Sequence, residues 1–499
     1  MAHARRTEIS AAVEELPAEE GRALRELADR MFSRAAGAAL IGGNQVRLLE
    51  DGRENYPAWL AAIAAARHYV HFENYFIYDD AVGRELAAAL SEKARAGVRV
   101  RVIYDWLGGF GKASGRFWGA LRAAGVEVRV HNPPRLSSPF GWTSRDHRKT
   151  LVVDGAVGFV AGLCVGRMWV GDPSRGIAPW RDTGVEIRGP AVREIARAFA
   201  RSWASAGGRL SEIDTSYEPP PVGDVSLRIV ASEPATASML RLDQLVAAIA
   251  RRRLWITDPY YSGIASYAQA LSAAAADGVD VRLLVPHATD IPMLQPLSRA
   301  GYRVLLEAGI RVFEWNGTML HAKTAVADGR WARVGSTNLN LASWLGNFEL
   351  DAVIEDSAFS REMEAAYERD LASSTELVLD DRHKVRAPGQ PRRPRGGTPR
   401  TGSSSAGSVA AGAVRIGNAV GAVLRNRRVL GPVQARMTTA VGLGLCGLAL
   451  LVTLFPRMLA APLALLSLWG GLALLWKGVS LRRKSRRAAA ESVKDPETP

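Results

Sequence analysis

The spacing of apolar positions predicts the same strand–helix–strand unit twice, within residues 69–105 and 254–286. Each unit opens with a continuous apolar run that is typical of a buried strand. An Ala- and Leu-rich amphipathic helix is expected next, ending at Gly97 in the first unit and at Gly278 in the second, because glycine readily adopts the conformation that closes a helix. A Val-rich strand follows each glycine. Together these features predict parallel β-α-β units.

A second helix–glycine–strand pattern extends both units, at residues 121–133 and 305–316. The sequences HRKTLVVDG and HAKTAVADG come next, so the order of features is the same twice, at a separation of about 175–185 residues. A repeat of this length indicates two similar domains, because the repeats of solenoid proteins are only about 20–50 residues long.

Composition divides the chain into six parts. We expect a helical N-terminal extension, with its helix around residues 24–36, two α/β domains, a basic Pro- and Gly-rich linker, an apolar hairpin and a basic tail. In this order the parts cover residues 1–40, 41–215, 216–381, 382–437, 438–476 and 477–499.

Two apolar runs near the C-terminus, 438–455 and 458–476, are each close to the roughly 17–25 residues that cross a bilayer. Neither run contains a charged residue, and Lys and Arg flank both outer ends. The positive-inside rule therefore predicts a transmembrane helical hairpin with both ends in the cytoplasm. A buried hairpin of a soluble protein is the alternative. Residues 1–20 lack the apolar stretch of a secretory signal, so we expect the two α/β domains to face the cytoplasm.

The net charge of +14 comes entirely from the C-terminal part of the chain. Residues 382–490 contain 19 Lys and Arg and no Asp or Glu, whereas residues 1–381 contain 44 Lys and Arg against 47 Asp and Glu. A basic tail of this kind suits an anionic membrane surface. The slight acidity of residues 1–381 argues against a nucleic-acid partner, because binding to a phosphate backbone depends on Lys and Arg. The two cysteines exclude a disulfide framework.

The candidate chemistry lies in a doubled motif, a His, a Lys two residues later and an Asp five residues after the Lys. Its members are His147, Lys149 and Asp154 in the first repeat and His321, Lys323 and Asp328 in the second. Two matches at equivalent places in a repeat make a chance occurrence improbable. The second copy continues into Ser336 and Asn338 and then Glu349, which aligns with Asp182 in the first repeat.

At these motifs the sequence resembles the phospholipase D superfamily and is most similar to bacterial cardiolipin synthases. The resemblance rests on FENYFI at 72–77, RDHRKTLVVDG at 145–155 and GSTNLNLASWLGNFEL at 335–350, and it covers residues 41–375. It implies two αβα sandwich domains with pseudo-twofold symmetry and their motifs meeting at the interface. It implies no metal or organic cofactor. One chain supplies both motifs, so the enzyme is expected to act as a monomer.

The residue types suit transfer of a phosphoryl group, for which catalysis is mainly positioning and electrostatic stabilisation. Lys149 and Lys323 can supply positive charge, and Ser336 and Asn338 can donate hydrogen bonds to the phosphate oxygens. The resemblance further implies that His147 attacks phosphorus and forms a phosphohistidine, while His321 handles the proton of the alcohol.

The remaining residues of the motifs are expected to support the histidines. By the resemblance, Asp182 and Glu349 orient the imidazole rings, since a carboxylate on one ring nitrogen fixes the tautomer. We expect Asp154 and Asp328 to hold the motif loops rather than to act on phosphate. Cys164 stands where the family often has Asn, and an apolar strand precedes it, so we expect it to pack rather than react.

Two further pairs occupy equivalent positions in the repeats, Glu73 with Asp258 and Tyr75 with Tyr260. The carboxylates either line the cleft or are solvated at strand ends. The tyrosines either stack near the cleft or belong to the core.

Three functions remain open from the sequence. The first is phosphatidyl transfer that makes cardiolipin from the anionic phospholipid phosphatidylglycerol at a membrane. The second is hydrolysis of phospholipid to phosphatidic acid, which uses the same residues and differs in how well water is excluded from the second step. The third is a nuclease or a phosphodiester-binding protein.

Overall fold

A computed structural model describes residues 18–134, 143–210, 217–290, 294–379, 385 and 386, and five positions between 468 and 476. The chain forms two compact units, one of residues 1–131 with 144–408 and the other of 132–143 with 409–499. The first unit contains both sequence repeats, and the description below concerns this unit.

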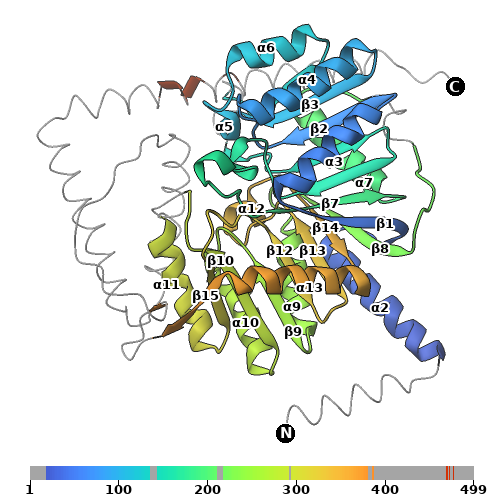
Figure 1. Ribbon diagram of the computed structural model, residues 1–499. Helices are drawn as coiled ribbons and strands as arrows, with labels where there is room; N and C mark the ends of the chain where they lie inside the picture. The colour runs from blue at the N-terminus through green and yellow to red at the C-terminus, as the bar shows by residue number, and fades with distance from the viewer. Residues whose placement is uncertain are drawn as a thin grey trace, which may run out of the picture. The chain divides into compact units, whose positions relative to one another are not determined.

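All the strands described form one mixed sheet in the order β16-β15-β11-β10-β9-β12-β13-β14-β8-β1-β7-β6-β5-β2-β3-β4 (Figure 1). The strands of the first repeat are β1 (Ile41–Glu50), β2 (Tyr69–Asn74), β3 (Arg99–Asp105), β4 (Glu127–His131), β5 (Lys149–Val153), β6 (Val157–Ala161) and β7 (Thr183–Arg188). Those of the second are β8 (Val225–Ser232), β9 (Arg253–Thr257), β10 (Asp280–Pro286), β11 (Arg311–Trp315), β12 (Thr324–Ala327), β13 (Trp331–Gly335), β14 (Glu349–Ile354), β15 (Ser374–Leu379) and β16 (Val385–Arg386).

The strand order is the same in the two repeats when it is followed outward from the central β1–β8 pair. The first repeat continues as β7-β6-β5-β2-β3-β4 and the second as β14-β13-β12-β9-β10-β11. Strands β2, β3 and β4 are parallel to one another, as are β9, β10 and β11, which confirms the predicted β-α-β units. Strands β1 and β8 pair antiparallel, so hydrogen bonds join the two repeats into one sheet.

Helices cover the sheet and end where the sequence predicts. They are α2 (Ala18–Ala36), α3 (Asp51–Ala65), α4 (Ala81–Arg95), α5 (Trp106–Gly109), α6 (Gly115–Ala123), α7 (Val192–Ser205), α9 (Ser238–Ile249), α10 (Ala265–Ala276), α11 (Leu294–Glu307), α12 (Leu341–Leu345) and α13 (Ser357–Ala372). Gly97 and Gly278, just beyond α4 and α10, both have φ of +88°, the left-handed conformation that closes a helix without a side-chain clash. The N-terminal helix expected around residues 24–36 is the longer helix α2.

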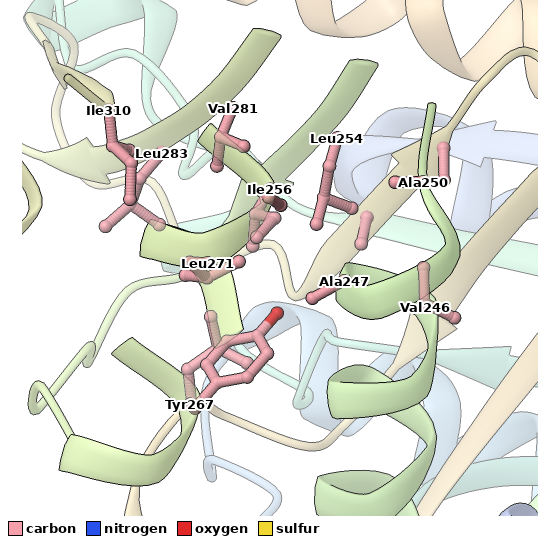
Figure 2. Packing of buried hydrophobic residues seen from close by; sticks show 14 of the residues in the cluster. Val246, Ala247, Ala250, Leu254, Ile256, Tyr267, Leu271, Val281, Leu283 and Ile310 are labelled. Atoms are coloured by element: carbon pink, nitrogen blue, oxygen red, sulfur yellow. The ribbon is translucent and has the colours of Figure 1, made fainter. Parts of the chain in front are cut away.

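The apolar core has parts within each repeat and a part that both repeats share. In the second repeat, Leu254 and Ile256 of β9 and Leu283 of β10 pack against α9 and α10, where Leu271 is fully buried (Figure 2). The shared part lies under α7 of the first repeat and α13 of the second, and it contains buried residues from strands of both repeats. The two repeats therefore bury apolar surface together rather than as separate bodies.

The predicted membrane hairpin, residues 438–476, lies almost wholly outside the described residues. Positions 468, 469, 471, 472 and 476 are helical. Within the described part of the chain, we find no helix that is both long enough and apolar enough to cross a membrane.

Replacement of Leu271 by Ala should destabilise the protein by about 2–5 kcal/mol, because it removes a fully buried side chain and leaves a cavity. Chemical denaturation of the two proteins measures this difference. Ile249, at the end of the neighbouring helix α9, is 47% exposed, and Ile249→Ala should change the free energy of unfolding by less than about 1 kcal/mol. Equal losses in the two variants would contradict the packing described here.

Candidate active site

The two motif histidines lie just before equivalent strands of the sheet. His147 precedes β5, which pairs with β2, and His321 precedes β12, which pairs with β9. The side chains are nearly buried, with 9% of His147 and 6% of His321 exposed. Both histidines therefore lie at the C-terminal ends of the parallel strands.

Each histidine is hydrogen-bonded to a carboxylate from the other repeat. The Nδ1 atom of His147 lies 2.9 Å from Oε2 of Glu349, and Nδ1 of His321 lies 2.7 Å from Oδ2 of Asp182. The two carboxylates begin or immediately precede β14 and β7, the strands next to the central pair. The predicted carboxylate partners are thus present, and they are exchanged between the repeats.

The main chain makes the same exchange. The N–H of His147 donates to the carbonyl of Phe348, at 2.9 Å, and the N–H of His321 donates to the carbonyl of Arg181, at 2.7 Å. Phe348 and Arg181 are the residues that directly precede the two carboxylates. Each motif loop is therefore held in register with the carboxylate that orients its histidine.

Burial and charge set the protonation states of these pairs. Burial, opposed by Glu349, lowers the pKa of His147 to about 4, and burial together with Lys323 lowers the pKa of His321 to about 4. Although burial alone would raise the pKa of Asp182, His321 and Lys323 lower it to about 2. Burial alone would also raise the pKa of Glu349, but His147, Lys149 and Ser336 together lower it. At neutral pH both rings are uncharged and donate Nδ1–H to a carboxylate, which leaves Nε2 without a proton.

The motif lysines concentrate positive charge between the two histidines. Nζ of Lys149 donates to the carbonyl of His147 and Nζ of Lys323 to that of His321. Burial lowers the pKa of Lys323 to about 8, and Lys149 contributes to this shift. The charge of Lys323 also lowers the pKa of His147, and that of Lys149 lowers the pKa of His321. The two motifs therefore act electrostatically on one common site.

Ser336 is placed differently from the sequence-based expectation. Its hydroxyl donates to Oε2 of Glu349 at 2.6 Å and accepts the N–H of Leu350 at 2.9 Å. The amide of Asn347 donates to Oε1 of the same glutamate at 3.0 Å. Ser336 was expected to donate to phosphate oxygens, but its hydrogen goes to the carboxylate instead, so it helps to orient His147 through Glu349.

Asn338 has a side chain with spare hydrogen-bonding capacity. Its Nδ2 makes one long contact, 3.4 Å from Oγ of Ser343, and its buried Oδ1 has no partner among the described residues. The expected role of Asn338 as a donor to the phosphate therefore stays a prediction.

The first repeat anchors its carboxylate in another way. Gly162 stands where the second repeat has Ser336, and a Cβ there would lie 2.1 Å from Oδ1 of Asp182. The indole N–H of Trp169 donates to Oδ2 of Asp182 at 2.9 Å. Cys164, in the position of Asn338, is 1% exposed, and burial raises the pKa of its thiol. This fits the packing role expected for Cys164.

The motif aspartates do not contact the histidines. The carboxylate of Asp154 accepts three main-chain N–H bonds, from Arg67, His68 and Tyr69. Asp328 accepts the equivalent three, from residues 251, 252 and 253. Both aspartates have φ of +52°. They hold the turn that follows each motif strand, as expected, and this accounts for the Asp of the motif without a step on phosphate.

The repeat-equivalent carboxylates are buried and not solvated. Glu73 is fully buried and accepts the hydroxyl of Thr150, and burial and Asp146 raise its pKa to about 8. Asp258 is also fully buried and accepts the N–H groups of Leu339 and Tyr260. The solvated alternative for this pair is therefore wrong, and the cleft-lining alternative stays a prediction.

The repeat-equivalent tyrosines lie at the site. The ring centroids of Tyr75 and His147 are 4.9 Å apart, and those of Tyr260 and His321 are 6.0 Å apart. Both rings therefore contact the motif histidines, in line with the first of the two alternatives for this pair.

Two buried arginines escaped the sequence analysis. Arg148 donates to main-chain carbonyls of three elements, at Ala198, Ser232 and Glu349. Arg181 joins the repeats by pairing with Asp51 and Asp370. Their positions next to His147 and Asp182 were the available signal, but an isolated Arg in a sequence is usually solvated.

No group of three or more His, Cys, Asp or Glu side chains in the described ranges is arranged to hold a metal ion. The side chains at the site are two neutral imidazoles, two cationic amines and the amide of Asn338. This combination defines a paired-histidine site that is suited to phosphoryl transfer.

Comparison with known proteins agrees with this class. Residues 59–168 and 245–371 match the family model described as "Cardiolipin synthase, PLD-like domain". A cardiolipin synthase of Halalkalibacterium halodurans is 35% identical over 66% of this chain and 66% of its own length. Cardiolipin synthase A of Pseudomonas aeruginosa is 36% identical over 69% of this chain and 71% of its own length.

The chain therefore belongs to the phospholipase D-like family of cardiolipin synthases. A crystal structure of phosphatidylserine synthase from Haemophilus influenzae has the same fold, with a TM-score of 0.54 and 14% identity over 70% of this chain and 91% of that one.

The depressed pKa of His321 should make stability depend on pH. The folded-state pKa of about 4 lies below the ordinary value of 6.5, so the unfolded chain binds the proton first as pH falls. The contribution of this group is complete above pH 6.5 and is lost between pH 6.5 and pH 4. From pH 7 to pH 5, the wild type should lose about 2 kcal/mol more than His321→Gln.

Chemical denaturation at the two pH values measures this difference. His68 has an exposed side chain, and His68→Gln should follow the wild-type profile. Identical pH profiles for His321→Gln and the wild type would show that His321 is not buried in its neutral form.

Proposed function

We propose that this protein is a phosphatidyltransferase that joins two molecules of phosphatidylglycerol into cardiolipin and releases glycerol. The observation that carries the proposal is the pair of neutral histidines, each oriented by an ionised carboxylate of the other repeat, around two lysines. The names of the similar proteins supply the product, cardiolipin. No cofactor is required for these steps.

In the first step, Nε2 of His147 attacks the phosphorus of the donor lipid. A phosphorus–nitrogen bond forms and the bond to the glycerol oxygen breaks. The departing alkoxide takes a proton from Nε2 of His321, which receives it from the ammonium group of Lys323, 3.1 Å away. In the second step, His321 takes the proton of the incoming hydroxyl and returns it to Lys323, while the hydroxyl oxygen attacks phosphorus and releases His147. Lys149, Lys323 and Asn338 stabilise the negative charge that the transition state spreads over the phosphate oxygens.

The contacts of the two lysines support this division of roles. Nζ of Lys323 lies 2.9 Å from Nδ1 and 3.1 Å from Nε2 of His321, whereas the hydrogen bond of Lys149 goes to the main chain of His147. An ammonium group beside the ring can replace a proton that the ring donates. Its pKa of about 8 makes that transfer easier than for an ordinary lysine.

Ser336, Asp182 and Glu349 act as positioning residues in this scheme, because their contacts are with the histidines and with one another. Asp154 and Asp328 support the motif turns. Hydrolysis to phosphatidic acid is the second candidate function, since water can replace the acceptor hydroxyl in the same step. A nuclease activity is disfavoured by the net charge of −3 on residues 1–381.

The wider organisation is also part of the proposal. Residues 41–215 and 216–381 would be two domains related by a pseudo-twofold axis near the β1–β8 pair. The repeated strand order supports this division and this axis. The linker 382–437 would lead to a transmembrane hairpin at 438–476 and a basic tail at 477–499. This arrangement would place a monomeric enzyme on the cytoplasmic face of a bacterial inner membrane.

The first test concerns the intermediate. With phosphatidylglycerol labelled at phosphorus, rapid quenching of the wild type should trap acid-labile label on His147. His147→Ala should form none, whereas His321→Ala should form label slowly and retain it, because its second step lacks the base. A labelled intermediate in His147→Ala would reverse the roles of the two histidines.

The second test concerns the products. Purified full-length protein in vesicles of labelled phosphatidylglycerol should yield cardiolipin and free glycerol. His147→Ala should reduce the rate by about 10³-fold or more, as expected for loss of a nucleophile. Phosphatidic acid as the main product would identify a hydrolase, and the absence of any lipid product would overturn the proposed function.

A further inference from the structure

His321 is surrounded by aromatic rings to a greater extent than His147. The ring centroids of Trp169, Trp180 and Tyr260 lie 5.6, 5.8 and 6.0 Å from that of His321. Among the described residues, Tyr75 is the single ring in this kind of contact with His147. Tyr75 and Tyr260 are equivalent in the repeats, so the difference between the two sites lies in the two tryptophans.

Both tryptophans belong to one short segment of the first repeat, which we call the aromatic flap (residues 169–180). Trp169 and Trp180 are its two ends, and their ring centroids are 5.0 Å apart. The N–H of Trp180 donates to the carbonyl of Met168 at 2.8 Å, which closes the segment into a loop. A bridge between Asp172 and Ile177 stiffens its tip.

The flap reaches the histidine of the opposite repeat. The hydroxyl of Thr318, three residues before His321, donates to the carbonyl of Pro179 at 2.8 Å. Trp169 is completely buried and is tied to Asp182, whereas Trp180 is partly exposed. Of the two tryptophans beside His321, Trp180 is therefore the one that reaches solvent, and Trp169 is fixed in the interior.

This position matters for the step in which His321 acts as a base. The phosphohistidine can react with a lipid hydroxyl or with water, and both reactions break the phosphorus–nitrogen bond, form a phosphorus–oxygen bond and deliver one proton to His321. Water is small, abundant and needs no binding site. An enzyme that transfers the phosphatidyl group must therefore keep water away from Nε2 of His321 until the acceptor is bound.

We propose that Trp180, held by the aromatic flap, determines whether the acceptor is a lipid alcohol or water. Its indole covers the approach to His321 on the solvent side. The apolar surface of the indole favours an acceptor with an apolar body over water at the position next to His321. The inference rests on the proposed function and adds to it the residue that sets the choice between transfer and hydrolysis.

The test compares product ratios in full-length protein on phosphatidylglycerol vesicles. Trp180→Ala should raise the ratio of phosphatidic acid to cardiolipin by roughly tenfold, the order of discrimination that one hydrophobic contact provides. Donor consumption should change much less, because His147 and its carboxylate are untouched. Trp180→Phe keeps an aromatic ring and should restore most of the wild-type ratio.

Ile177→Ala is the matched control. Ile177 lies on the same flap, is 43% exposed and has no aromatic ring. Its replacement should therefore leave the product ratio unchanged. An unchanged ratio in Trp180→Ala, or a proportional loss of both products, would overturn the role of Trp180. A wild type that makes no cardiolipin would instead overturn the proposed transferase function, which separates the two failures.

Discussion

The hydrogen bonds between each motif histidine and a carboxylate of the other repeat are the constraint on which this site depends. Glu349 and Asp182 are fully buried and ionised, and burial of an unpaired carboxylate costs several kcal/mol. Neither repeat can complete its own pair, so separating them would leave both carboxylates without their histidine partners. The antiparallel β1–β8 pair and the core shared by α7 and α13 keep the repeats together. The same contacts that build the site therefore also join the repeats.

Equivalent positions in the two repeats support these pairs with different chemistry. Glu349 receives a serine hydroxyl and an asparagine amide, whereas Asp182 receives the indole N–H of Trp169. The main-chain N–H of one histidine donates to the carbonyl of Phe348 and that of the other to the carbonyl of Arg181. The side chain of Arg181 also pairs with Asp51 and Asp370. In a duplicated fold, only the geometry of the histidine–carboxylate pairs needs to be the same in the two repeats. The supporting side chains are then free to differ, and in the proposed reaction the two histidines have different tasks.

Neutral histidines and a charged lysine are compatible in one site because their ordinary pKa values differ. Burial lowers the pKa of both imidazoles, and the lysines add to this effect, so the rings remain uncharged at neutral pH. Lys323 loses part of its usual basicity for the same reason. An anionic phosphodiester that enters such a site meets positive charge that has already been stripped of water. The strength of this interaction comes from that preorganisation.

The sequence by itself determined the repeated β-α-β units, the family and the residues of both motifs. These features depend on local patterns: apolar spacing, the glycines that end helices, and a short motif that occurs twice. It also indicated the supporting role of Asp154 and Asp328. Only the tertiary structure decided that the carboxylates are exchanged between repeats, that Ser336 serves Glu349, that Glu73 and Asp258 are buried, and that two tryptophans of the aromatic flap lie beside His321. Each of these contacts joins residues that are distant in the chain or depends on burial, and a single sequence contains no local pattern that reports either.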